Sequence, residues 1–299
     1  MEYTTGAMTM RDSPDEAAYV GQTDDELMQA STVFRDGLLR GQVVLVSGGG
    51  GGIGRAICYL FGRLGASVVA CGRDEAKLAR LAANLERLGA PNFTQAMTVR
   101  DPVQVAALMD AAWARFGRLD VVINNAGGQY AAPALDITPK GWHAVIETNL
   151  YGTWYMMQEA GRRWIARDEH GSIVNMVIPV QRGPGVGIPH TMASRAGQIA
   201  VSRSLAVEWA PHGIRVNCIA LGIFASPGLD RYPPTARPSF TVNPMRRLGD
   251  VHDVAEACVY LSAPSGRFIT AEVLTLDGGG QAWGEFWPLG KPAHFRIED

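Results

Sequence analysis

The stretch VSGGGGGIG, residues 46–54, connects an apolar run at residues 43–46 to a segment at residues 55–64 whose apolar residues recur at helical spacing. Glycine allows a tight turn and brings backbone N–H groups close to phosphate oxygens at the start of a helix. The glycines also match the G-x-G-x-x-G spacing that is typical of dinucleotide-binding turns. A glycine-rich segment alone can be a flexible linker, but its position between a strand and a helix favours a phosphate-binding turn.

Beyond this turn, short apolar runs alternate with helical patterns along the chain. This alternation is typical of a parallel sheet with helices on both faces. Strands are expected at residues 42–47, 67–71, 93–97, 120–123, 171–177, 214–219 and 272–276. Helices between them are expected to include residues 74–88, 102–116, 142–168, 191–211 and 251–262. The sequence therefore predicts an α/β fold, a doubly wound parallel sheet of about seven strands with helices on both faces.

The chain is expected to consist of an arm and one domain. Residues 1–40 are polar and acidic, and we expect an N-terminal arm with one short helix at about residues 24–34. Residues 41–299 are expected to form a single domain, because one α/β domain of this length is ordinary. A proline-rich insertion at about residues 223–245 follows the sixth expected strand. Ligands bind beyond the carboxyl ends of strands in open sheets, so this insertion is a candidate substrate loop, although a stiffened surface loop would look the same.

The composition is that of a globular protein, since 47% of the 299 residues are hydrophobic and the mean hydropathy is +0.00. The net charge of −2 and the pI of about 6.3 do not indicate nucleic acid or an acidic membrane surface as a partner. The four cysteines form neither a CxxC pair nor a metal-binding spacing, so we expect thiols in a reducing compartment and no metal site. No apolar run approaches membrane-spanning length, and no secretory signal is evident. These features predict a cytoplasmic protein.

Several motifs, in the same order along the chain, resemble those of the short-chain dehydrogenase/reductase family. They are the spacing Gly48-x-x-x-Gly52-Ile53-Gly54, the segment Asn124-Asn125-Ala126-Gly127, Asn149, the strand at residues 171–175, and Asp277-Gly278-Gly279 after the last expected strand. The resemblance covers roughly residues 40–280. It implies a Rossmann fold, oxidoreductase activity with a nicotinamide cofactor, and assembly as a homotetramer.

The resemblance also implies where the cofactor binds. The residues implied are Ser47, Gly48, Gly52, Ile53, Gly54, Arg73, Asn125, Ala126, Gly127, Arg195 and Gly222. A family member that binds NAD carries a carboxylate about 20 residues after the glycines, where it accepts hydrogen bonds from the ribose. This chain has Gly72 and Arg73 there, and a guanidinium matches a phosphate group. We therefore predict NADP(H), with Arg73 on the 2′-phosphate; the alternative is that Arg73 pairs locally with Asp74 or Glu75.

The serine, tyrosine and lysine of the family are replaced in this chain. Thr191 stands at the tyrosine position, Arg195 stands at the lysine position, and the serine position falls at or near Ile178. Of the four family groups, Asn149 is retained. A threonine hydroxyl is a much weaker acid than a phenol, and an arginine cannot relay protons. Reduction of a ketone, which places full alkoxide charge on the substrate oxygen, is therefore disfavoured.

Reduction of a conjugated C=C bond makes weaker demands on the site, because the charge spreads onto the thioester oxygen and needs hydrogen-bond donors. Five segments resemble the branch that contains trans-2-enoyl-CoA reductases and 2,4-dienoyl-CoA reductases, at residues 125–130, 140–150, 170–179, 190–197 and 204–210. We therefore predict an NADPH-dependent reductase of a trans-2-enoyl thioester, a small-molecule partner.

The resemblance to this branch also implies the reacting residues. The catalytic candidates are Gln129, Tyr130, Asn149, Thr191 and Arg195. Gln129 and Tyr130 would face the acyl group, and Arg100 would meet the CoA phosphates, with Arg231 as a second candidate for that anionic tail. Two other hypotheses stay open: a reductase of a specialised carbonyl or enone, and an NADP-binding member without redox activity that serves as a cyclase, an isomerase or a partner subunit.

Overall fold

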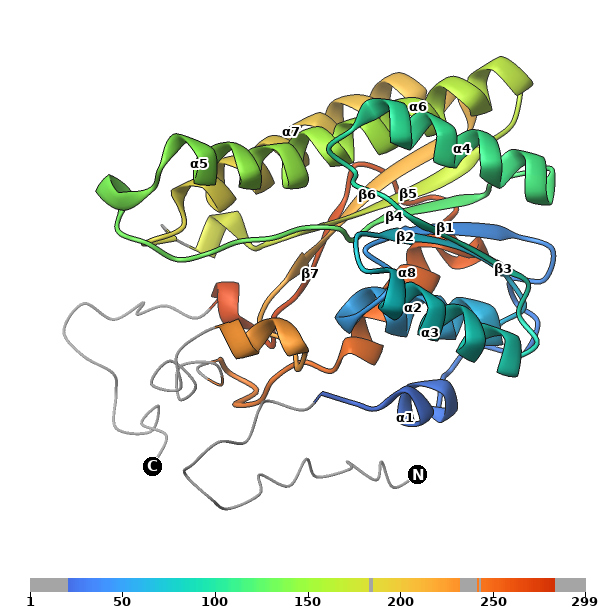
Figure 1. The fold of residues 1–299 in the computed structure, drawn as a ribbon, viewed down its shortest axis with the longest axis horizontal. Coiled ribbons are helices and arrows are strands. Elements are labelled where there is room, and N and C mark those ends of the chain that lie inside the picture. The colour runs from blue at the N-terminus through green and yellow to red at the C-terminus, as the bar shows by residue number, and fades with distance from the viewer. Residues whose placement is uncertain (1–20, 183–184, 232–240, 242, 283–299) are drawn as a thin grey trace.

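Seven parallel strands form the centre of the molecule (Figure 1). The computed structural model describes residues 21–182, 185–231, 241 and 243–282. The order across the sheet is β3-β2-β1-β4-β5-β6-β7, so the chain moves outward from β1 in one direction and then outward from β4 in the other. The strands are β1 (Val43–Ser47), β2 (Ser67–Gly72), β3 (Asn92–Ala96), β4 (Val121–Asn124), β5 (Gly171–Val177), β6 (Ile214–Leu221) and β7 (Val273–Leu276).

Helices cover both faces of the sheet, as Figure 1 shows. The helices on one face are α2 (Gly52–Arg63), α3 (Glu75–Arg87) and α8 (Val251–Ser262), and those on the other are α4 (Pro102–Phe116), α6 (Gly152–Arg167) and α7 (Pro189–Trp209). A shorter helix, α5 (Pro139–Ile146), packs against α7. The predicted doubly wound α/β fold is confirmed.

The central strands β1 and β4 are buried and largely apolar because helices cover both faces of the sheet, whereas the edge strand β3 is only partly buried and carries Asn92, Thr94 and Gln95. In β1, Val44 and Val46 belong to the apolar cluster with α2 and α8, while Val43 and Leu45 belong to the cluster with α4 and α6. The same alternation continues in β2. Side chains that alternate along each strand therefore fill two cores, and the positions of all seven strands agree with those expected within two residues.

The helix expected at residues 142–168 is not continuous. Its first part begins at Pro139, where the Thr138 hydroxyl caps the first turn, and a π-helical turn at Glu147–Tyr151 interrupts it before α6 continues. The carbonyl of Ala144 accepts hydrogen bonds from the Thr148 hydroxyl and from the Arg100 guanidinium, both at 2.8 Å. These donors compete with the backbone N–H for that carbonyl, which favours the wider turn.

The described part of the expected arm packs against the body of the protein. Its helix α1 (Asp24–Gln29) is shorter than the expected helix at residues 24–34, because the Ala30 carbonyl after its last turn bonds Arg63 instead of extending the helix. Leu27 and Met28 of α1 are buried in the cluster that contains α2, and Leu39 is fully buried. Residues 22–39 thus contribute to one of the two cores, while the division of the chain at about residue 40 stays a prediction.

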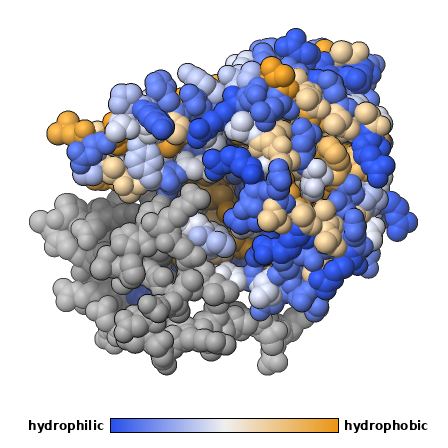
Figure 2. Space-filling view, viewed as in Figure 1, coloured by the Kyte–Doolittle hydropathy of each residue, from blue (hydrophilic) through white to orange (hydrophobic). Residues whose placement is uncertain are grey.

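The surface and the cysteines of the described residues have the following character. In the view of Figure 2, hydrophilic side chains dominate the described surface and border a hollow near its centre. Among the described residues, no helix has the length and apolar character that crossing a membrane requires, and no group of histidine, cysteine and carboxylate side chains could hold a metal ion. The four cysteines are free and buried, and burial raises the pKa of each thiol.

Candidate functional site

A cleft of about 560 Å³ opens at the carboxyl ends of β1, β2 and β4. It lies where the strand order reverses, between β1 and β4, which is the ligand-binding position of open parallel sheets. Its walls are the glycine turn after β1 and the segments that follow β2, β3 and β4. Residues 226–228 of the expected substrate loop also line it, whereas residues 232–240 and 242 of that loop lie outside the described residues. A cleft of this size suits a cofactor-sized organic molecule.

The glycine turn is shaped to receive an anion. Gly48 and Gly52 have φ angles of +67° and +51°, which side chains rarely adopt, and a Cβ on Gly54 would overlap the Gly48 carbonyl. Helix α2 begins after Gly51 without a side-chain cap, whereas α3, α4, α5 and α8 are each capped by an aspartate or threonine side chain. The first-turn N–H groups of α2 are therefore left for a ligand. These features fit the pyrophosphate of a dinucleotide.

Ser47 and Asn125 join the ends of β1 and β4 beside this turn. The Ser47 hydroxyl accepts hydrogen bonds from the backbone N–H groups of Asn125 and Ala126 at 3.1 and 3.0 Å. The Asn125 side chain in turn donates to the carbonyls of Ser47 and Gly48 at 3.1 and 3.2 Å. Their role is to hold the two strand ends and the glycine turn in one arrangement.

The structure brings most of the predicted cofactor residues together. Those that line the cleft are Gly48, Gly52, Ile53, Arg73, Asn125, Ala126 and Gly127. Ser47 and Gly54 lie directly behind them, through the contacts just described. Gly222, at the end of β6, donates its backbone N–H to Leu276 and does not line this cleft. Its role therefore stays a prediction.

The cleft is strongly basic. Arg73 is exposed at the end of β2, and the cleft is lined by four further basic side chains, those of Arg55, Lys77, Arg80 and Arg100. Asp74, the one acidic residue among the described residues of the lining, caps α3 and pairs with Lys77 at 3.3 Å. We did not expect Arg55, Lys77 and Arg80 from the sequence. A signal was present, because Arg55 directly follows the last glycine of the turn and Lys77 and Arg80 are three residues apart on α3.

Asn149 sits in the π-helical turn and is fully buried. Its carbonyl oxygen accepts from the Gly128 N–H at 2.9 Å, and its amide donates to the Gly128 carbonyl at 3.0 Å and to the Ser194 hydroxyl at 3.2 Å. The side chain therefore holds the peptide before Gln129 and links it to α7. Ser194, which sequence reasoning did not single out, donates to the Thr191 carbonyl at 2.9 Å and so fixes the first turns of α7.

Arg195 connects β5 to the loop that follows β4. One terminal nitrogen donates to the Met176 carbonyl at 2.7 Å and to Gln198 at 2.9 Å. The other terminal nitrogen lies against Gly127, where a Cβ would overlap it. Burial lowers the pKa of Arg195 to about 10, which still leaves the guanidinium charged at neutral pH. The position at which the family has a lysine thus holds, in this chain, a fixed cation next to Gly127, which lines the cleft.

The first turn of α7 carries two buried polar atoms without a partner. Thr191 is buried, and its hydroxyl makes no hydrogen bond in the described part of the chain. His190 is fully buried; its Nδ1 accepts from the Thr191 N–H at 2.9 Å, and its Nε2 has no partner there. Because Nδ1 is an acceptor, the neutral ring carries its hydrogen on Nε2. Unpaired buried donors are rare in folded proteins and gather at functional sites.

Gln129 and Tyr130 follow the Gly128 peptide that Asn149 holds. The Tyr130 ring packs edge-on against His190, with ring centroids 4.6 Å apart and an interplanar angle of 84°. Its hydroxyl lies over Gly141 at the start of α5. Gln129 is half-buried in the same loop. The structure thus places the Tyr130 ring beside the first turn of α7, and the role of Gln129 and Tyr130 at the acyl group stays a prediction.

Arg100 lines the cleft, but its guanidinium is bonded within the protein. It donates to the Thr148 hydroxyl at 2.7 Å and to the Ala144 carbonyl at 2.8 Å, and Glu147 lies 4.0 Å away. A role at the CoA phosphates therefore stays a prediction. Arg231 ends the short 3-10 helix Pro227–Arg231, and its side chain lies outside the described residues.

Comparisons with known proteins agree with this geometry. A family model described as enoyl-(acyl carrier protein) reductase matches residues 48–281. The chain is 34% identical to a probable 2,4-dienoyl-CoA reductase of Bacillus subtilis over 244 residues, which are 80% of this chain and 96% of the relative. It is 33% identical to a peroxisomal 2,4-dienoyl-CoA reductase of Danio rerio over 269 residues, which are 88% of each protein.

Solved structures show the same relationship. A short chain dehydrogenase from Bacillus anthracis superimposes with a TM-score of 0.75 at 34% identity, covering 83% of this chain and 99% of the other. A citronellol catabolism dehydrogenase of Pseudomonas aeruginosa gives the same TM-score and identity and covers 84% and 99% of the two chains. With the glycine turn, the Asn-Asn-Ala-Gly segment and the seven-stranded parallel sheet, these matches show that the chain belongs to the short-chain dehydrogenase/reductase family of oxidoreductases.

Proposed function

We propose that the protein reduces the C=C bond of a trans-2-enoyl thioester, with CoA as the thiol and NADPH as the cofactor. When bound, the reduced nicotinamide supplies a hydride to the β-carbon of the substrate. The observation that carries the proposal is the first turn of α7, where a buried Thr191 hydroxyl with no partner in the described part of the chain occupies the position of the family's tyrosine. The similarity to 2,4-dienoyl-CoA reductases supports an unsaturated acyl-CoA thioester as the substrate.

The first two turns of α7, which carry Thr191 and Arg195, are called the reacting end of the site. Their side chains suit an enolate better than an alkoxide. A ketone oxygen must be protonated as it becomes an alkoxide, and neither Thr191 nor Arg195 is an acid of suitable strength. An enolate oxygen needs hydrogen-bond donors, and a threonine hydroxyl is one. We propose that Thr191 donates to this oxygen, that Arg195 keeps positive charge beside the cofactor, and that water protonates the α-carbon.

Other side chains hold this arrangement in place. Asn149 fixes the Gly128 peptide and thereby the start of the Gln129-Tyr130 segment. Its hydrogen-bonding groups are taken up by Gly128 and Ser194, so we assign it a positioning role. Gln129 and Tyr130 then form the wall against the acyl group.

The cofactor proposal rests on the charge of the cleft. Arg73 stands exposed where a carboxylate would accept from the ribose of NAD, and Arg55, Lys77 and Arg80 line the same end. A cation cluster of this kind suits the dianionic 2′-phosphate of NADP and offers nothing specific to the ribose hydroxyl of NAD.

The test is oxidation of NADPH by the purified protein, measured as the loss of absorbance of the reduced nicotinamide. We expect turnover with crotonyl-CoA and longer 2-enoyl-CoA esters and little with the matched 3-ketoacyl-CoA esters. A parallel series of 2,4-dienoyl-CoA esters distinguishes the two substrate classes of the related branch. Turnover of free enones or ketones in preference to thioesters would favour a specialised carbonyl or enone substrate. Tight binding of NADPH without turnover of any ester would favour a member without redox activity.

The assembly and the location of the protein belong to the same proposal. We propose a homotetramer, as the family resemblance implies, and light scattering coupled to size-exclusion chromatography measures the mass directly. A cytoplasmic location is likewise proposed from the sequence.

A further inference from the structure

We propose that Asp24, in the segment that precedes the Rossmann sheet, is a positioning residue for the phosphate-binding end of the cofactor cleft. It holds Arg55 and Arg80 in place, so that residues 22–29 complete the site for the 2′-phosphate of NADP. This inference rests on the proposed preference for NADPH and extends it to a part of the chain that no motif of the family includes.

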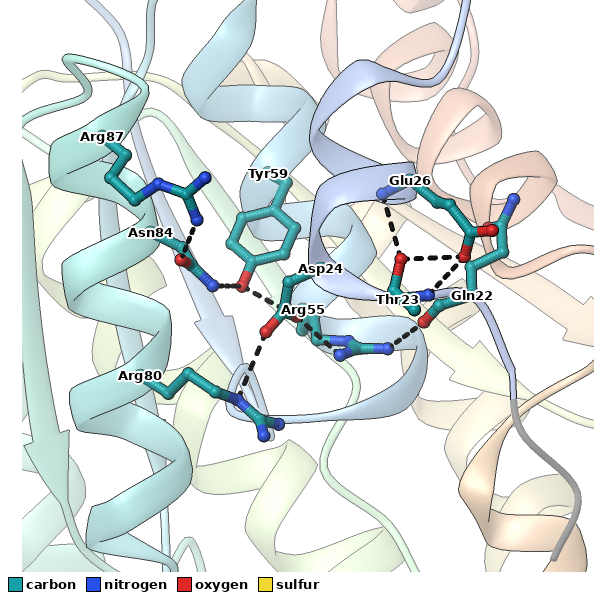
Figure 3. A network of polar contacts seen from close by, with 9 residues as sticks. All are labelled: Gln22, Thr23, Asp24, Glu26, Arg55, Tyr59, Arg80, Asn84 and Arg87. Atoms are coloured by element: carbon teal, nitrogen blue, oxygen red, sulfur yellow. Dashed lines mark hydrogen bonds and ion pairs between the residues drawn. The ribbon is translucent and has the colours of Figure 1, made fainter.

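The Asp24 carboxylate lies between the two arginines, as Figure 3 shows. One oxygen accepts from the Arg55 guanidinium at 2.6 Å and from the Tyr59 hydroxyl at 3.1 Å. The other lies 3.3 Å from Nε of Arg80. The carboxylate therefore bridges α2, which follows the glycine turn, and α3, which follows Arg73.

The surroundings keep this bridge in one geometry. Arg55 also donates to the Gln22 carbonyl at 2.5 Å, and Tyr59 accepts from the Asn84 amide at 2.8 Å (Figure 3). Burial raises the pKa of Tyr59 to about 12, so the phenol stays protonated and donates to Asp24. Thr23 and Glu26 form a capping box that fixes the first turn of α1 and with it the position of Asp24.

Asp24 acts from behind the cleft and does not compete with a ligand inside it. Arg55 and Arg80 line the cleft, and Asp24 does not. The Arg55 side chain is 13% exposed and that of Asp24 19%, so this pair is largely withdrawn from water. Asp24 contacts Arg80 through Nε, and the Arg80 side chain remains 56% exposed. Asp24 thus engages Nε and leaves the two terminal nitrogens of Arg80, which match a phosphate in geometry and charge, for a ligand.

The charges explain why a carboxylate is needed here. Arg55 lies in the first turn of α2, where the helix dipole disfavours a cation, and Arg73, Lys77 and Arg80 line the same cleft. Without Asp24, repulsion among these cations would move Arg80 outward into water. A buried Arg55 would lose its counter-ion at the same time.

The experiment measures the dissociation constants of NADPH and NADH by titration calorimetry, without substrate, for the wild type and Asp24→Asn. We expect about a tenfold loss of NADPH affinity in Asp24→Asn and less than about a twofold change for NADH, since the Gln22 carbonyl still holds Arg55 and the displaced Arg80 would contact only the 2′-phosphate. Asp25→Asn is the matched control. Its carboxylate is next in sequence and pairs with Arg87 at 3.0 Å, but both side chains are exposed and neither lines the cleft. It should bind both cofactors as the wild type does.

Arg80→Gln provides a second variant that keeps the buried part of the network. We expect it to lose NADPH affinity alone, and Asp24→Asn should then add less than its effect in the wild type, because both act through the same guanidinium. NADPH affinity that is unchanged or higher in Asp24→Asn would overturn the inference, as would equal losses for NADPH and NADH. If the wild type itself does not prefer NADPH, the proposed cofactor is wrong, whatever the role of Asp24.

Discussion

The two ends of the candidate site are built in different ways. At the cofactor end, the shape of the site comes mainly from the backbone. It is formed by glycines with positive φ angles, by a helix without a side-chain cap, and by two strand ends that Ser47 and Asn125 hold together. At the reacting end, side chains on the first turn of α7 are held in place while some of their polar atoms stay unpaired. Backbone geometry thus shapes the first end, whereas buried side-chain atoms without a partner among the described residues mark the second.

Unpaired buried groups at the reacting end lower the stability of the folded protein. Leaving a buried donor or acceptor without a partner destabilises a protein by about 1–3 kcal/mol. Such a loss persists where a substrate later supplies the missing partner. Among the described residues, these groups include the Thr191 hydroxyl and Nε2 of His190. This contrast between the two ends predicts opposite responses of stability and activity to mutation.

The largest effect is expected for Thr191→Val. Valine keeps the shape of threonine and removes the hydroxyl, which has no partner among the described residues. If this hydroxyl donates to the enolate oxygen, kcat on an enoyl-CoA ester should fall by a factor on the order of 100 to 1000. The melting temperature should stay the same or rise, because no hydrogen bond within the protein is lost. Steady-state kinetics and a thermal melt on the same sample measure the two effects.

Thr191→Ser is the matched control, since it keeps the hydroxyl and should retain most of the activity. A Thr191→Val protein with full activity would mean that the threonine is an ordinary core residue, and a lower melting temperature with unchanged kcat would show that its hydroxyl is paired in solution.

The next effect concerns the shape of the cofactor end. In Gly54→Ala the new Cβ would overlap the Gly48 carbonyl, so the turn must open and its N–H groups move away from the phosphates. We expect a loss of cofactor affinity of about 100-fold, equal for NADPH and NADH, because the pyrophosphate is common to both. Titration calorimetry of both cofactors measures it.

Gly51→Ala is the control within the same turn. Gly51 has an extended φ of −164°, and a Cβ there would meet only the Lys77 side chain, at 3.8 Å. This variant should bind both cofactors nearly as the wild type does. Equal losses in the two alanine variants would show that flexibility of the turn, and not the close approach at Gly54, is what the glycines provide.

The difference between the two ends of the site also explains which of their residues could be predicted from the sequence. The fold and the cofactor end follow from local rules: apolar runs give buried strands, and glycines between a strand and a helix give a phosphate turn. Arg73 could be found because it stands a fixed distance after the glycines. Asp24 could not be found in this way, since its partners Arg55 and Arg80 are 31 and 56 residues away in sequence and meet it only when α1 packs on α2 and α3.

The reacting end could be predicted only in part. The spacing of Thr191 and Arg195 identified the replaced family positions, but not the interruption of the helix around Asn149, which depends on Arg100 reaching the Ala144 carbonyl from another segment. The contacts of Ser194 and His190 could not be predicted from the sequence. Their importance appears only through the contacts with Asn149 and Tyr130.

A smaller effect is expected for Arg73→Gln. Arg73 is exposed and lines the cleft, so its removal should leave the fold unchanged and weaken NADPH binding by about tenfold, with little change for NADH. Arg87→Gln, on the exposed side of α3 and outside the cleft, is the matched control. The ratio of NADPH to NADH affinity is the measurement. An unchanged ratio would mean that Arg73 pairs locally with Asp74 or Glu75 and that the other cations select the cofactor.

The smallest effect is expected for Tyr130→Phe. This variant tests whether Tyr130 only packs against the acyl group or also donates the proton. The Tyr130 ring packs against His190, while its hydroxyl lies over Gly141 at the start of α5. Phenylalanine keeps the ring contact, so we expect kcat on an enoyl-CoA ester to change by less than about threefold. Tyr130→Ala should do more damage, chiefly to KM, because the wall itself is lost. A drop in kcat of about 100-fold in Tyr130→Phe, on the scale of a lost proton donor, would instead make this phenol the acid. The reacting end would then be completed by a residue of the protein and not by the ligand.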